Sequence, residues 1–205
     1  MIYSIGHSTR QPEEFNELLR AHGATHLVDI RSHPTSKWEW FWKDTMPDWL
    51  EAPYIWEPRL GGWTEAHVDA VDQLAIPVDI SPYVKGQFPK QHIAQTQENE
   101  PDKPRWTSIG LWDYQYFTVL PEFHQGCLEL PDGAAIMCAE ALWWKCHRSM
   151  VADYLWQVCG IDVQHIMSPK QLTAHSRALG NRLERYELDV QEIWHQRQVH
   201  PPVAE

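Results

Sequence analysis

The sequence predicts a single Rossmann-like α/β domain over residues 1–205, in which helices flank a mostly parallel sheet. A strand over residues 2–5, a helix from residue 11 and a second strand over 26–30 form a βαβ unit, whose crossover should be right-handed. An apolar run over 134–138 then ends in a polar loop and a helix over 149–159, which repeats the strand–helix order. The chain is long enough for one domain with a sizeable core.

Local patterns predict the remaining elements. Pro12 and the two glutamates after it suit the first turn of the first helix, and Gly23 is a typical helix stop. Pro121 should kink or split the helix predicted around it, because proline removes a helical hydrogen bond. The other predicted elements are a short helix over 47–51, a strand over 54–56, a helix over 64–74, an irregular excursion over 77–104, a helix over 112–128, a strand over 161–166 and a C-terminal helical extension over 168–199.

Composition argues against several classes of partner. The formal net charge of −11 repels nucleic-acid phosphates, and no basic stripe offsets it, so a nucleic-acid partner is not expected. No apolar run approaches the roughly 20 residues of a membrane span, and no signal-peptide pattern precedes the first strand. We therefore expect a cytoplasmic protein without a membrane partner. Its thiols should be reduced, with Cys127, Cys138 and Cys159 serving in packing.

Polar side chains follow three predicted strands at the point where each strand ends. His7 and Ser8 follow the first strand, Asp29 and Arg31 end the second, and residues 138–149 leave the third. Because the carboxyl ends of parallel strands meet at one edge of a sheet, we expect these loops to converge. The sequence thus predicts a ligand site at this edge.

Cys146 is the candidate nucleophile of the edge. It precedes the predicted helix over 149–159, whose N-terminus favours an anion and, together with Arg148, would stabilise a thiolate. His147 is adjacent and is a candidate substrate contact, although neighbours in a chain often point apart. The alternative is that Cys146 only packs where the loop meets the sheet.

The charged residues of the edge each have two interpretations. Arg148 would hold an anionic substrate or form an ion pair with Asp29 or Glu140. Arg31 and Asp29 would bind substrate or pair with each other. Glu140 would act as a general acid or base at a buried strand end, or would anchor Arg148 or a helix amide.

The first loop and a glycine pair complete the candidate site. His7 would transfer protons and Ser8 would bind an anion, unless Ser8 merely caps the following helix. Gly61 and Gly62 permit backbone geometry that lets the chain approach either a ligand or another segment.

A metal site is the remaining interpretation, with Cys138, Glu140, Cys146 and His147 as ligands. Their spacing matches no standard zinc pattern, so no metal is expected. The chain also lacks the P-loop signature and the G-x-G-x-x-G signature of dinucleotide-binding domains, so no cofactor is expected.

Five sequence motifs within residues 2–166 occur in the order seen in one known family. They are Ser4-Ile-Gly-His-Ser8, Val28-Asp-Ile-Arg-Ser32 with Pro34 and Ser36, Leu60-Gly-Gly62, Gly110-Leu-Trp-Asp-Tyr114, and Cys138-Ala-Glu140 with Cys146-His-Arg148. The chain thereby resembles the DUF488 family of prokaryotic proteins, and the resemblance implies a small α/β domain with a parallel sheet. It implies no activity. Trp143-Trp144, the aromatic run over 38–42 and the excursion over 77–104 depart from the family pattern.

The predicted function is that of an enzyme acting on a small anionic substrate, a nucleotide or a phosphorylated metabolite, at the carboxyl edge of the sheet. Cys146 would be the nucleophile, and Glu140 or His7 would transfer protons. Arg31 and Arg148 would position the anion. Two alternatives stay open: a non-catalytic module that binds an anion, a nucleotide or a nucleic-acid end, and a structural network without a ligand. The sequence predicts no oligomeric state.

Overall fold

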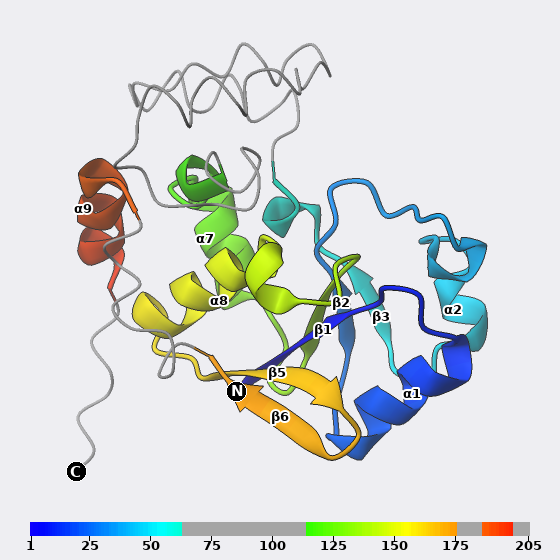
Figure 1. The fold of residues 1–205 in the computed structure, drawn as a ribbon. Helices are drawn as coiled ribbons and strands as arrows, with labels where there is room; N and C mark the ends of the chain where they lie inside the picture. Colours follow the sequence, from blue (N-terminus) through cyan, green and yellow to red (C-terminus); the bar gives the residue numbers. More distant parts are fainter. Residues whose placement is uncertain (63–113, 176–185, 199–205) are drawn as a thin grey trace, which may run out of the picture.

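The computed structural model describes residues 1–62, 114–175 and 186–198, which form six strands and several helices (Figure 1). The strands are β1 (Ile2–Gly6), β2 (Leu27–Asp29), β3 (Tyr54–Trp56), β4 (Ala135–Cys138), β5 (Val163–Ser168) and β6 (Gln171–Ala174). The helices are α1 (Pro12–Ala21), α2 (Met46–Trp49), α7 (Pro121–Leu128), α8 (Arg148–Gln157) and α9 (Leu188–Arg197), with short 3-10 helices at η1 (Glu39–Phe41), η2 (Pro58–Leu60) and η3 (Trp143–Lys145).

The sheet has the strand order β3-β2-β4-β1-β5-β6. All its neighbouring pairs are parallel except β5 and β6, so the α/β class and the mostly parallel sheet are confirmed. β4 lies between β1 and β2, the two strands of the predicted βαβ unit. In this register Gly6 is opposite Cys138 and Asp29 is opposite Met137, so three strand ends reach the same edge together.

Side chains of the central strands alternate between two apolar layers. Tyr3 and Ile5 of β1 pack in a cluster with Phe15 of α1, whereas Ile2 belongs to the cluster formed with α7, α8 and α9. Figure 1 shows α1 and α2 on one side of the sheet and α7 and α8 on the other. Because both faces are covered, β4 is apolar on both sides, which explains the continuous apolar run seen in the sequence.

The structure corrects one predicted element and confirms the predicted break at Pro121, and two other predicted elements fall outside the described residues. The extension over 168–199 is not helical throughout, because β6 pairs antiparallel with β5 before α9 begins. The side chains of β6 are largely exposed and its Gln-Leu-Thr-Ala alternation is only four residues long, so the pairing with β5 defines the strand. Pro121 splits the predicted helix: residues 114–117 are helical, a turn follows and α7 starts at the proline. The predicted helix over 64–74 and the excursion over 77–104 lie outside the described residues.

Within the described ranges, no helix combines the length and the hydropathy that a membrane span requires.

Candidate functional site at the carboxyl edge of the sheet

The loops that leave β1, β2 and β4 meet at the carboxyl edge, as predicted. The His7 amide donates to the Cys138 carbonyl at 2.9 Å, which joins the loop after β1 to the end of β4. Nε2 of His147 lies 3.0 Å from the Ile30 carbonyl oxygen, which joins the loop after β4 to the end of β2. These contacts bring the candidate residues of all three loops into one network.

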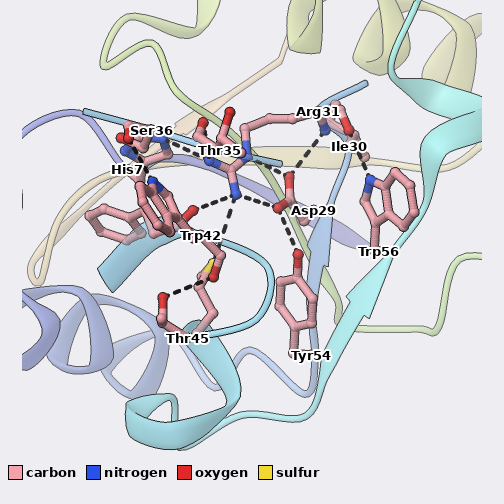
Figure 2. Close-up of polar contacts among 12 residues, drawn as sticks. His7, Asp29, Ile30, Arg31, Thr35, Ser36, Trp42, Thr45, Tyr54 and Trp56 are labelled. Atoms are coloured by element: carbon pink, nitrogen blue, oxygen red, sulfur yellow. Dashed lines mark hydrogen bonds and ion pairs between the residues drawn. The ribbon is translucent and has the colours of Figure 1, made fainter. Parts of the chain in front are cut away.

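Arg31 forms a buried ion pair with Asp29 (Figure 2). Its Nε donates to Asp29 Oδ1 at 2.8 Å, and its Nη2 donates to Asp29 Oδ2 at 2.5 Å and to the Phe41 carbonyl at 2.8 Å. Its Nη1 donates to the Thr35 carbonyl at 3.2 Å and to His7 Nε2 at 3.3 Å. A guanidinium has five N–H donors, and these contacts use all five. The geometry therefore favours the ion-pair interpretation of Arg31 over direct binding of a substrate.

Tyr54 completes the surroundings of this ion pair from β3. Its hydroxyl donates to Asp29 Oδ2 at 2.8 Å. Burial and the neighbouring Asp29 carboxylate raise the pKa of Tyr54, so the phenol remains a hydrogen-bond donor. Burial opposes the charge of Arg31, but the bonds to Asp29 raise its pKa, and the arginine stays a cation. The strand position of Tyr54 gave no sequence signal for this role.

His7 is neutral and is engaged at both ring nitrogens. Nδ1 lies 3.1 Å from the Ser8 carbonyl and donates to it, which leaves Nε2 to accept from Arg31. The ring stacks on Phe41 with centroids 4.3 Å apart. Burial, and then the charge of Arg31, lower the pKa of His7 to about 4. This arrangement favours a positioning role over the predicted proton transfer.

The low pKa of His7 is expected to make the fold less stable in acid. The pKa is about 4 in the folded protein against an ordinary 6.5, so between these values the unfolded chain binds more protons. The stabilisation is fully present above pH 6.5 and is lost as the pH falls towards 4. At ~1.4 kcal/mol per pKa unit it reaches at most about 3.5 kcal/mol. The free energy of unfolding can be measured with urea at several pH values in this range. It should depend less steeply on pH in His7→Gln than in the wild type.

The control for this experiment is His33→Gln, which changes an exposed histidine. Arg31, Asp29 and Arg148 are the charged groups that act on His7, and both variants retain them. An equal pH dependence of the unfolding free energy in His7→Gln and the wild type would contradict the lowered pKa of His7.

Arg148 is buried, and no carboxylate of the described residues contacts its guanidinium. Its side chain, in a residue that is 1% exposed, donates from Nη1 to Ser4 Oγ at 3.2 Å and from Nη2 to the backbone carbonyl of Glu140. Its Nε makes no hydrogen bond to any described residue. The predicted ion pair with Asp29 or Glu140 is wrong, because Asp29 binds Arg31 and the Glu140 side chain is exposed. The exposure of Glu140 also removes the buried position expected for a general acid.

Cys138, Cys146 and His147 form the chemically richest cluster of the edge. His147 Nδ1 lies 3.7 Å from Cys138 Sγ and 3.6 Å from Cys146 Sγ, and the three atoms are all within 4.8 Å of one another. The His147 ring packs against Tyr114, with centroids 5.1 Å apart. Cys138 was expected to pack or, in the metal interpretation, to be a ligand, and its position at the end of β4 lies at the same edge as Cys146. The position of Cys138 at a strand end, beside the loop that holds Cys146, is the sequence feature that could have indicated its place in this cluster.

The two thiols differ in their protonation. Burial opposes ionisation of Cys146, but the hydrogen bond from Cys138 and the charges of His147 and Arg148 lower its pKa well below that of an ordinary thiol. The bond to Cys146 and burial raise the pKa of Cys138. Although burial disfavours its charge, the neighbouring Cys146 raises the pKa of His147. These opposite directions favour negative charge on Cys146 and a proton on Cys138.

Ser8 and the glycine pair position the loops. Ser8 adopts a positive φ of 50°, and α1 has no side-chain cap, so the predicted capping role of Ser8 is wrong. A Cβ on Gly61 would lie 2.5 Å from the Ser32 amide nitrogen, so Gly61 allows a close approach of another segment. Gly62 has a φ of 98° beside the Tyr114 ring.

Comparison with known proteins identifies the family. The family model described as "Domain of unknown function DUF488" matches residues 11–84 and 112–155, more than half of the chain. The chain belongs to the DUF488 family. Searches of curated proteins and of solved structures gave no match.

The DUF488 match covers most of the candidate site. It includes Asp29 and Arg31 of the second loop and Cys138, Cys146 and Arg148 of the third. His7 and Ser8 precede it. The family assignment carries no substrate, so the chemistry of the edge must be argued from its geometry.

Proposed function

We propose that this DUF488 protein is an enzyme that acts on a small anionic substrate at the carboxyl edge, with Cys146 and His147 at the reaction centre. One observation carries the proposal: the buried Arg148 guanidinium contacts only neutral oxygen atoms of described residues. A buried charge without a counter-ion is unfavourable, and an anion nearby relieves it. The substrate would supply part of that negative charge.

The balance of charge around Arg148 supports an anionic substrate. Asp29 neutralises Arg31, whereas Arg10 bonds to the Gly6 carbonyl and lies 3.4 Å from Glu14, whose side chain is 57% exposed. Arg148 is therefore a buried cation of the edge that no described carboxylate contacts, in a chain whose formal net charge is −11. A buried cation on an acidic molecule attracts small anions locally, whereas large polyanions are repelled by the rest of the surface.

A second candidate is a non-catalytic anion-binding module. The observation that favours it is the low exposure of Cys146, which is 3% in this conformation. The two candidates differ in their dependence on Cys146. Binding alone would survive Cys146→Ala, whereas turnover of a phosphorylated or acyl compound would be lost in that variant.

A substitution of Arg10 tests anion binding without changing the buried residues Asp29, Arg31 and Arg148. Arg10→Gln should weaken the binding of pyrophosphate or AMP about 3- to 10-fold, which is about 0.7–1.4 kcal/mol. Isothermal titration calorimetry measures this, and the affinity should fall further as salt is added. Arg20→Gln is the matched control, because Arg20 is 63% exposed and pairs with Glu51 on the flank of α1. Equal losses in both variants, or no binding in the wild type, would overturn the proposal.

A further inference from the structure

We propose that Cys138, Cys146 and His147 are three ligands of one zinc ion. The inference deepens the proposed function, because it gives the reaction centre a metal, and it rests on that function for the role of the metal. The donor set is two sulfur atoms and one imidazole nitrogen, which zinc prefers in proteins. The sequence spacing gave no zinc pattern, since the ligands come from the end of β4 and the start of α8.

The distances fit one coordination tetrahedron. Zn–S bonds of about 2.3 Å and Zn–N bonds of about 2.0–2.1 Å place tetrahedral sulfur and nitrogen donors about 3.5–3.6 Å apart. His147 Nδ1 lies 3.6 Å from Cys146 Sγ and 3.7 Å from Cys138 Sγ. Both sulfur–nitrogen distances therefore match those between ligands of one tetrahedral zinc ion.

The hydrogen bond on the far side of His147 presents the correct nitrogen. Nε2 lies 3.0 Å from the Ile30 carbonyl and must carry a proton to donate to it, which leaves the lone pair of a neutral ring on Nδ1. Such a bond from the non-ligating nitrogen is typical of zinc-binding histidines, because it fixes the tautomer and the ring orientation.

The surrounding charge suits two thiolate ligands. Two buried thiolates would be unfavourable alone, but Zn²⁺ neutralises both and the buried Arg148 lies on the same loop. The cysteines bind as thiolates, so their thiol protons pass to solvent when the metal binds. Cys146 would then serve as a ligand and the metal would replace it as the reactive group.

The described residues supply three ligands, which is the number found in catalytic zinc sites. Among the described residues, no fourth histidine, cysteine or carboxylate joins the group. Structural zinc sites have four protein ligands, whereas catalytic sites have three and leave one position for water or substrate. An anion drawn to the Arg148 guanidinium would be the ligand at that position.

Metal titration of the full chain tests the inference. Chelator-treated, reduced wild-type protein should bind one equivalent of Zn²⁺ in competition with a chromophoric chelator. Co²⁺ should give thiolate-to-metal charge transfer and the intense visible bands of tetrahedral coordination. Cys138→Ser, Cys146→Ser and His147→Gln should each weaken binding by more than about 100-fold, beyond the effect of losing an outer hydrogen bond. Cys127→Ala and Cys159→Ala are the matched controls, because both cysteines lie outside the group.

The outcomes separate this inference from the proposed function. The wild-type cobalt spectrum alone decides the donor set, even where a ligand variant fails to fold. Absence of stoichiometric binding, a spectrum without thiolate bands, or a Cys138–Cys146 disulfide in the reduced preparation would overturn the zinc site. Anion binding that depends on Arg10 but persists without zinc would leave the proposed function standing. Stoichiometric zinc without that anion binding would support the metal site alone.

Discussion

Replacing Arg31 by methionine is expected to lower the free energy of unfolding by about 3–5 kcal/mol. The substitution leaves Asp29 buried, at 0% exposure, without its cation. It also removes the donors to the Thr35 and Phe41 carbonyls and to His7. Urea unfolding followed by circular dichroism measures the loss. Because all the N–H donors of Arg31 bond to other groups of the protein, the substitution should lower stability and should not act through lost substrate contacts.

Arg59 provides a matched control within the same chain. Glu57 and Arg59 have the same two-residue spacing as Asp29 and Arg31. Arg59 donates from Nε and Nη2 to the Glu57 carboxylate, at 2.7 and 2.6 Å. The Arg59 side chain is 33% exposed, whereas that of Arg31 is 5% exposed. Arg59→Met should therefore lose about 1 kcal/mol or less. A stable Arg31→Met variant that no longer binds anions would instead assign Arg31 to the substrate.

Gly6→Ala is expected to destabilise the protein by about 3 kcal/mol or more, or to prevent folding. A Cβ on Gly6 would lie 1.9 Å from the Glu140 carbonyl oxygen, and 2.9 Å from Arg148 Nη2. Because a backbone atom makes the closest contact, rotation of a side chain cannot relieve it. The loop after β4 would have to move, and Cys146 would move with it. Thermal unfolding and the solubility of the variant measure the effect.

Gly126→Ala is the control for a mild substitution of a buried glycine. Its Cβ would meet Leu60 Cδ2 at 3.2 Å and Arg59 Cβ at 3.3 Å, within α7. Alanine favours the helix by roughly 0.5–1 kcal/mol, which offsets the contact. We expect a change of less than about 1 kcal/mol. Comparable losses at both glycines would refute the close approach of β1 to the loop after β4.

Local pattern by itself determined where the strands end and which side chains stand there. The length of the apolar run that ends at Cys138 predicted a covered strand, with the polar residues after it at its carboxyl end. Pro121 predicted the break before α7 for an equally local reason. Parallel pairing then followed from the strand–helix order, and convergence of the three loops followed from parallel pairing.

Tertiary structure alone decided which partners these side chains take. The spacing of Asp29 and Arg31 allowed a pair, but only the packing of the buried strand end directs every Arg31 donor inward. Among the described residues, that pairing leaves Arg148 without a carboxylate. Cys138 and Cys146 belong to different elements, and the register of β4 and the start of α8 bring both to His147. Distances between segments depend on packing, which local periodicity does not encode. The chemistry of the edge is therefore a property of the assembled fold.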